Sequence, residues 1–137
     1  MAISLKPTLT LESTGGSSGV SEDSSLSLSV TDTLTVTDPM VGISRVACTE
    51  TGASTIILPS VDATRYVYIK NTGLDASDDT TTATIKVEIG DGARIIDLAT
   101  DEFCFFPHHA EAAGVLQLEA SANTVIAEYA YWTKSSE

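Results

Sequence analysis

The chain has 137 residues, about the length of one domain, and is large enough to bury a hydrophobic core without disulfides or metals. Hydrophobic residues make up 42% of it, which excludes a disordered chain, and the net charge is −12. The seven Lys and Arg residues are scattered singly, and the negative charge repels phosphate groups. Neither nucleic acid nor an anionic membrane is therefore an expected partner.

The sequence predicts a soluble protein made in a cytoplasm. Residues 1–12 lack the basic end and apolar run of a signal peptide, and no later stretch approaches the roughly 20 apolar residues of a membrane span. Because a cytoplasm keeps thiols reduced, Cys48 and Cys104 are expected to be buried free thiols, with a disulfide between them as the alternative.

Residues 1–25 are predicted to form an extended N-terminal arm followed by a flexible loop. Apolar residues alternate with Ser, Lys and Thr from Ile3 to Leu11, as in a strand. Pro7 cannot donate a hydrogen bond to a neighbouring strand, so this segment is an edge strand or an arm. Gly, Ser and acidic residues dominate from Ser13 to Ser25, which is typical of a flexible segment.

Residues 26–137 are predicted to form one β-domain. Between Leu26 and Thr37 apolar residues alternate with Ser and Thr, and Asp32 interrupts the pattern at a bulge or a turn between two strands. The Asp-Gly pair in Gly90–Gly92 predicts a hairpin turn, Ser121–Asn123 a second one, and His108–Gly114 a possible single helical turn. The other predicted strands are Ile43–Thr49, Ser54–Leu58, Tyr66–Asn71, Ala83–Ile89, Ala93–Leu98, Glu102–Pro107, Val115–Ala120 and Thr124–Trp132.

These elements predict an all-β fold, an antiparallel β-sandwich. About nine or ten strands recur at intervals of about 8–12 residues, and no helical periodicity is sustained. A jelly roll is the leading version because the strands are numerous, and an immunoglobulin-like sandwich is the alternative. The core is expected between Arg65 and Trp132, where all eight aromatic residues lie.

Two short motifs suggest catalysis or metal binding, but neither has the context that this chemistry needs. Ser17 occupies the serine position of a G-x-S-x-G string, yet no strand-to-helix turn surrounds it, so a flexible loop is predicted. His108 and His109 are adjacent, so in a strand they point to opposite faces and do not match the H-x-H pair of a cupin. With Glu111 as the nearest carboxylate, a polar turn is predicted here in preference to a metal site.

The acidic residues give no defined site. Asp75, Asp78 and Asp79, with Asp91 from the neighbouring turn, offer oxygen ligands for calcium, but their spacing does not follow the EF-hand pattern. A solvated loop is therefore predicted. No pair among the 19 acidic residues stands out as a glycosidase pair, whose defining separation is spatial. We predict no catalytic, cofactor-binding or metal-binding residue.

The last strand is the best candidate for an aromatic contact surface. Tyr129 and Tyr131 share the parity of Val125 and Ala127, so they are expected in a core or a subunit interface. Trp132 has the opposite parity and is the better candidate for an exposed contact.

Four segments of the second half resemble small β-sandwich virion proteins of tailed bacteriophages, among them the capsid decoration or cement proteins. These segments are Tyr-Val-Tyr-Ile-Lys-Asn-Thr (66–72), Lys-Val-Glu-Ile-Gly-Asp-Gly (86–92), Asp-Glu-Phe-Cys-Phe-Phe-Pro (101–107) and Glu-Tyr-Ala-Tyr-Trp (128–132). The resemblance is one of pattern and covers about the last 70 residues.

The resemblance implies a non-enzymatic structural role in a virion, with the major capsid protein or another virion protein as partner. A homotrimer is favoured, because closed rings bury strand edges and aromatic surfaces. The alternative is a carbohydrate- or receptor-binding module of a tail or fibre.

Overall fold

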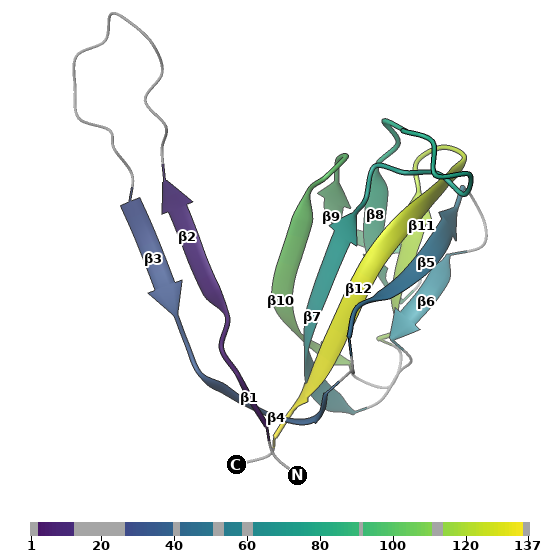
Figure 1. Ribbon diagram of the computed structural model, residues 1–137. Helices are drawn as coiled ribbons and strands as arrows, with labels where there is room; N and C mark the ends of the chain where they lie inside the picture. The colour runs from purple at the N-terminus through teal and green to yellow at the C-terminus, as the bar shows by residue number, and fades with distance from the viewer. Residues whose placement is uncertain are drawn as a thin grey trace, which may run out of the picture.

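The computed structural model describes residues 3–12, 27–39, 42–50, 54–58, 62–90, 92–110 and 114–135. Within these ranges there is no helix that could cross a membrane. The described residues form strands joined by turns and loops (Figure 1). The strands are β1 (Ile3–Leu5), β2 (Thr8–Glu12), β3 (Ser27–Thr31), β4 (Leu34–Pro39), β5 (Ser44–Thr49), β6 (Thr55–Leu58), β7 (Ala63–Asn71), β8 (Ile85–Ile89), β9 (Ala93–Leu98), β10 (Phe103–Ala110), β11 (Leu116–Ala120) and β12 (Thr124–Lys134).

Two antiparallel sheets form the body of the protein. In the large sheet the order is β1-β4-β12-β7-β10, and β5 also pairs with β12. The small sheet has the order β6-β11-β8-β9. β12 is long enough to serve two partners on one side, since β5 pairs with its residues 124–129 and β4 with residues 132–134. The predicted all-β, antiparallel sandwich is confirmed.

Successive strands of the body mostly change sheet. From β5 to β12 the chain alternates between the large and the small sheet, and only β8 and β9 follow each other within one sheet. β8 and β9 form the hairpin that Gly90–Gly92 predicted. The predicted hairpin of the last two strands is wrong: β11 lies in the small sheet and β12 in the large one. The backbone of Ser121 instead donates to the Thr84 carbonyl at 2.9 Å, which directs the turn across the sandwich.

A second hairpin stands apart from the sandwich. β2 and β3 pair with each other and with no other described strand, and they project from the end of the sandwich where β1 pairs with β4 (Figure 1). We call β2 and β3 together the projecting hairpin. β3, which the sequence assigned to the β-domain, thus pairs with β2 from the segment predicted as an arm, and the predicted boundary between residues 25 and 26 lies outside the described residues. The break predicted at Asp32 is present, since β3 ends at Thr31 and β4 begins at Leu34.

The core is aliphatic. It forms between the sheets because one parity of each central strand is apolar and points inward. The aromatic residues that suggested its position lie largely outside it, since only Phe106, Tyr129 and Tyr131 pack against it as partly buried rings. The core includes Cys48, Leu58, Val67, Ile69, Ile85, Val87, Leu116, Leu118, Val125 and Ala127.

Asn71 is the main buried polar group at one end of the sandwich. Its side chain is fully buried and donates to the carbonyls of Ala83 and Leu98, both at 3.0 Å, and accepts from the Gly73 backbone at 2.9 Å. Both amide hydrogens and the amide oxygen are thus used to connect three chain segments.

Asn71→Ala is expected to lower the free energy of unfolding by about 2–4 kcal/mol, because two buried carbonyls and one backbone amide lose their partner. Urea unfolding followed by circular dichroism measures this change. Ser77→Ala, at an exposed loop position, is the control and should unfold as the wild type does. A loss below about 0.5 kcal/mol for Asn71→Ala would show that water replaces the amide at little cost.

Candidate interaction surfaces

The projecting hairpin carries an uncovered apolar face. Cross-strand register places Leu9 opposite Val30 and Leu11 opposite Leu28, all on one side of the two strands. These four side chains are 40–53% exposed. The opposite side carries Ser and Thr residues and Glu12, with the Thr8 and Thr31 hydroxyls 3.2 Å apart. A two-stranded hairpin with no layer packed on it is marginally stable in water, so this face needs a covering surface.

The hairpin leaves the sandwich at a defined break. The Asp32 backbone donates to the Pro7 carbonyl at 3.3 Å, and the Asp32 carboxylate accepts from the Thr33 backbone at 2.7 Å. Pro7 and Asp32 are the residues that interrupt the apolar alternation of the first and second extended segments. A polar groove of about 420 Å³ lies where the hairpin meets the sandwich, between residues 32–35 on one side and Tyr66 and Lys134 on the other.

The second surface is a set of aromatic rings on the outer face of the large sheet, which we call the aromatic face: Tyr66, Tyr68, Phe103, Phe105 and Trp132. Register pairs place Phe105 beside Tyr68 and Trp132 beside Tyr66. The Tyr66 and Phe105 rings are nearly parallel, with centroids 6.1 Å apart, and Trp132 lies 6.5 Å from Phe105. Phe103 is 63% exposed and Phe105 39% exposed.

The outer face of the small sheet has a different character. Lys86 and Glu119 form an ion pair at 2.7 Å, and Glu88 accepts from Ser54 and Gln117, both at 3.4 Å. Its exposed apolar side chains, Ile56 and Ile95, lie on the two outermost strands, β6 and β9. The large sheet also carries charged side chains on its outer face, since Lys70 lies opposite Phe103 and Arg45 forms an ion pair with Glu128. Its apolar surface is the cluster of rings in the aromatic face, whereas the exposed apolar side chains of the small sheet lie apart on its two outermost strands.

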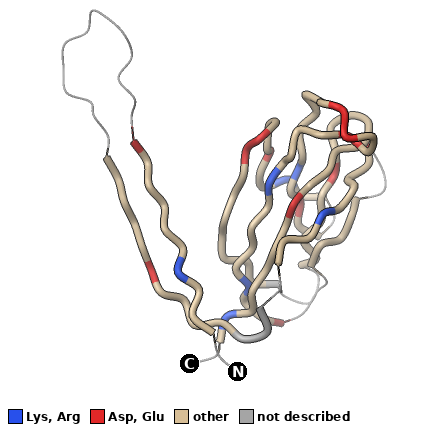
Figure 2. The backbone as a smooth tube through the Cα atoms, viewed as in Figure 1, with Lys and Arg blue, Asp and Glu red and all other residues tan. Residues whose placement is uncertain are grey.

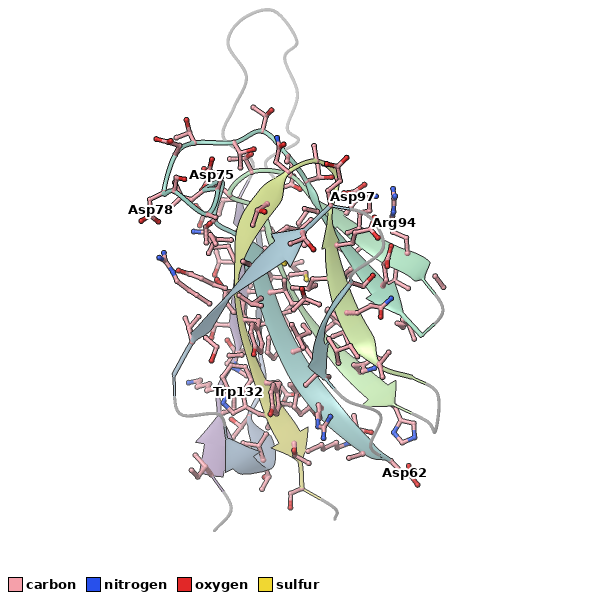
Figure 3. The ribbon with its side chains drawn as sticks, turned by 90° about the vertical axis from the view of Figure 1, so that its right-hand side faces the viewer. Asp62, Asp75, Asp78, Arg94, Asp97 and Trp132 are labelled. Atoms are coloured by element: carbon pink, nitrogen blue, oxygen red, sulfur yellow. The ribbon has the colours of Figure 1, made fainter. Side chains whose placement is uncertain are left out.

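The aromatic residues of β12 lie on the two faces of the large sheet that their parity predicted. Tyr129 and Tyr131 point toward the core, and the Arg65 guanidinium lies 5.5 Å from the Tyr131 ring centroid. Trp132 lies on the outer face beside Tyr66, toward the end of the sandwich where β1 pairs with β4 (Figure 3). The remaining members of the aromatic face were not singled out from the sequence, because Phe103–Phe106 is apolar at both parities and does not indicate which side faces inward.

The two histidines belong to β10, so the predicted polar turn and helical turn at this point are wrong as far as Ala110. As predicted, they point to opposite sides. His108 is buried, with its Nε2 3.3 Å from the Gly114 carbonyl, whereas His109 is exposed. Glu111 lies outside the described residues. No group of three or more His, Cys, Asp or Glu side chains placed to hold a metal occurs in the part of the chain that the structure describes.

His109 also contacts a hydroxyl and a carboxylate, a combination that the sequence did not suggest. Its Nδ1 lies 3.0 Å from the Thr64 hydroxyl, and its Nε2 lies 3.6 Å from the Asp62 carboxylate. The order resembles a nucleophile, base and acid. However, the Asp62 side chain is 91% exposed and that of His109 51%, so water competes for both groups. The Thr64–His109–Asp62 contacts therefore lie on the surface and lack the enclosed environment that strengthens catalytic charges.

The acidic loop is organised by its own backbone. The Asp75 carboxylate accepts from the Ser77 and Asp79 backbone amides at 2.8 and 3.0 Å. Asp78 has φ +62°, a left-handed conformation that Asp tolerates in turns. Asp75 and Asp78 lie at the opposite end of the sandwich from Asp62 (Figure 3). Asp91 and Ser17 lie outside the described residues.

Both cysteines are free, as expected. Cys48 is fully buried in the core and Cys104 is half-buried on β10. Burial raises the pKa of the Cys48 thiol to about 12 and that of the Cys104 thiol to about 11, both from 9.0. These groups therefore pack as small hydrophobic side chains.

Comparison with protein-family models, curated proteins and solved structures finds no match to this chain.

Thiol labelling provides a test of the cysteine environments. Only the thiolate reacts, and a pKa of about 11 lowers its fraction at pH 8 by about 100-fold relative to a pKa of 9.0. Labelling of the native protein by a maleimide, followed by mass spectrometry, should be slow at pH 8 and faster as the pH rises toward 11. In denaturant both cysteines should label rapidly. Rapid labelling of the folded protein, or a disulfide in the untreated protein, would contradict this.

Proposed function

We propose that this chain is a non-enzymatic virion structural protein, a capsid decoration or cement protein that binds the outer capsid lattice in the virion. Its partner is the major capsid protein or another virion protein, and neither nucleic acid nor a membrane is involved. The observation that carries the proposal is the projecting hairpin, whose apolar face has four aliphatic side chains 40–53% exposed. A chain that keeps such a face out of its own core is built to be completed by another protein.

The strand order supports the jelly-roll version of the sandwich, as in the resemblance to phage virion proteins. If β5 to β12 are counted as strands one to eight, β5-β12-β7-β10 in the large sheet has the order 1-8-3-6. In the small sheet β6-β11-β8-β9 has the order 2-7-4-5. This order results when a long antiparallel pair is wrapped into two facing sheets, the double Greek key of a jelly roll. Protein assembly is one of several functions that this architecture supports, so the function rests on the surfaces.

The charge distribution is also compatible with decoration. A net charge of −12 keeps a protein soluble at high copy number. The hairpin is nearly neutral by contrast: of the ten residues in β2 and β3, only Glu12 is charged (Figure 2). Contacts with neighbouring proteins in the lattice, among them further copies of this chain, are thus expected through the hairpin and the aromatic face, with a homotrimer as the favoured assembly.

Cosedimentation with assembled capsids tests the proposal. The wild type should bind at a defined stoichiometry, and deletion of residues 1–20 should weaken binding while the sandwich remains folded, because β4 to β12 are retained. Circular dichroism of the deleted protein is the control for folding. Unchanged capsid affinity after the deletion would show that the arm has no part in attachment, and failure of the wild type to bind would contradict the decoration role.

A carbohydrate- or receptor-binding module of a tail or fibre is the second candidate, favoured by the aromatic face. Exposed rings on a flat sheet can stack against sugar rings, and Tyr66 and Phe105 are nearly parallel at 6.1 Å. In this case the aromatic face binds a glycan and stays open.

Glycan-array binding separates the two functions. If the second candidate holds, the wild type binds a defined glycan class and Trp132→Ala reduces the signal by about tenfold or more, because a stacked ring contributes roughly 1.5 kcal/mol. Ile95→Ala, which removes an exposed apolar side chain from β9, is the control. The decoration role predicts no glycan binding by either protein.

A further inference from the structure

The geometry points to self-assembly in which the apolar face of the projecting hairpin of one copy covers the aromatic face of the next copy in a closed ring. This inference rests on the proposed function and names the partner of its two surfaces, a second copy of this chain.

The hairpin supplies the first half of the contact. Leu9, Leu11, Leu28 and Val30 lie on one side and have no second layer in the described chain, and the hairpin diverges from the sandwich (Figure 1). Face-to-face packing against another sheet is the arrangement that completes such an amphipathic pair.

The aromatic face supplies the second half. It gathers five aromatic side chains in one cluster, whereas the Lys86–Glu119 pair and Glu88 lie on the two central strands of the small sheet. An apolar hairpin packed on the small sheet would remove these charges from water, which is costly. Packing on Phe103 and Phe105 removes aromatic carbon surface from water and meets one charged neighbour, Lys70, which lies opposite Phe103.

The two surfaces match in length and charge. β2 and β3 each have five residues, and Phe103–Pro107 of β10 also spans five residues, so both surfaces extend over about 17 Å. The only ionised side chain of β2 and β3 is Glu12, and the charged side chain next to the aromatic face is that of Lys70, which lies opposite Phe103. Because each copy carries −12, contact through surfaces without further acidic groups avoids repulsion between copies.

The contact joins two different surfaces, so it is heterologous. Such a contact generates a ring if the rotation between neighbours closes, and every copy then donates one hairpin and accepts one. The base of the hairpin is anchored where β4 pairs with β12, next to Trp132. Trp132, the single tryptophan of the chain, therefore reports whether the aromatic face is covered.

Leu9→Glu and Thr10→Glu form a matched pair on the hairpin, with the same charge on adjacent residues of opposite faces. Leu9→Glu buries a charge in the contact and should weaken association by at least about 30-fold, whereas Thr10→Glu should associate as the wild type does. On the acceptor surface, Phe103→Ser should weaken association similarly, with Ile95→Ser as control. The wild-type side chains at these four positions are all exposed, so the variants should retain the folded sandwich.

Light scattering after size exclusion and Trp132 fluorescence provide the readouts. The wild type should have the mass of a small integer number of copies, and its emission should lie at shorter wavelength than that of Leu9→Glu. Raising the salt concentration should strengthen association, because it screens repulsion between acidic copies.

Mixing the two defective variants tests the heterologous geometry. Leu9→Glu retains the acceptor surface and Phe103→Ser retains the hairpin, so together they should form one-to-one dimers that do not grow. A monomeric wild type, or Phe103→Ser that assembles as the wild type does, overturns the inference. A monomer that still binds capsids leaves the decoration role standing, whereas a ring that does not bind capsids supports the inference and removes the decoration role.

Discussion

The sandwich depends on a single buried amide at the end where its loops meet. Asn71 closes β7 and ties its exit to the chain before β8 and to the end of β9, so that one side chain connects the two sheets. Neighbouring backbone bonds reinforce this point, since Asn71 also donates to Glu102 and accepts from Asp101 through its main chain. Gly73 completes the turn at φ +69°, and a Cβ at this position would collide with Thr100. The loops at this end thus have little freedom, whereas the opposite end carries the hairpin.

The inward-facing side of a strand could be predicted from the sequence only where apolar side chains are confined to one parity. Strict alternation in β8 predicted its buried parity, because only one parity was apolar. β9 was predicted with its observed limits because Asp-Gly marks its start. In β10 both parities are apolar, so the sequence could not reveal that Phe103 and Phe105 face outward while Cys104 and Phe106 face the core. The aromatic face was missed for this reason.

The connection of β11 to β12 shows a second limit. A three-residue turn between two alternating strands fits a hairpin and a crossover between sheets equally well, because local pattern does not record which sheet a strand joins. The bond from Ser121 to Thr84 decides in favour of the crossover, and it joins residues 37 positions apart. The projecting hairpin shows the reverse case. Its alternation was visible in the sequence, but an amphipathic pattern normally signals packing on a core, and here that layer is missing from the described chain.

The large sheet ends at β10, which pairs among the described strands only with β7. The unpaired side of this edge strand can form hydrogen bonds with an extended segment of another molecule. This is an aggregation hazard for any protein made in many copies. Pro107 lies in the middle of this strand and has no amide hydrogen, so a continuous ladder cannot form along the margin. Strand addition is thereby opposed at this edge of the large sheet, so that copies which meet here are expected to do so through side-chain packing.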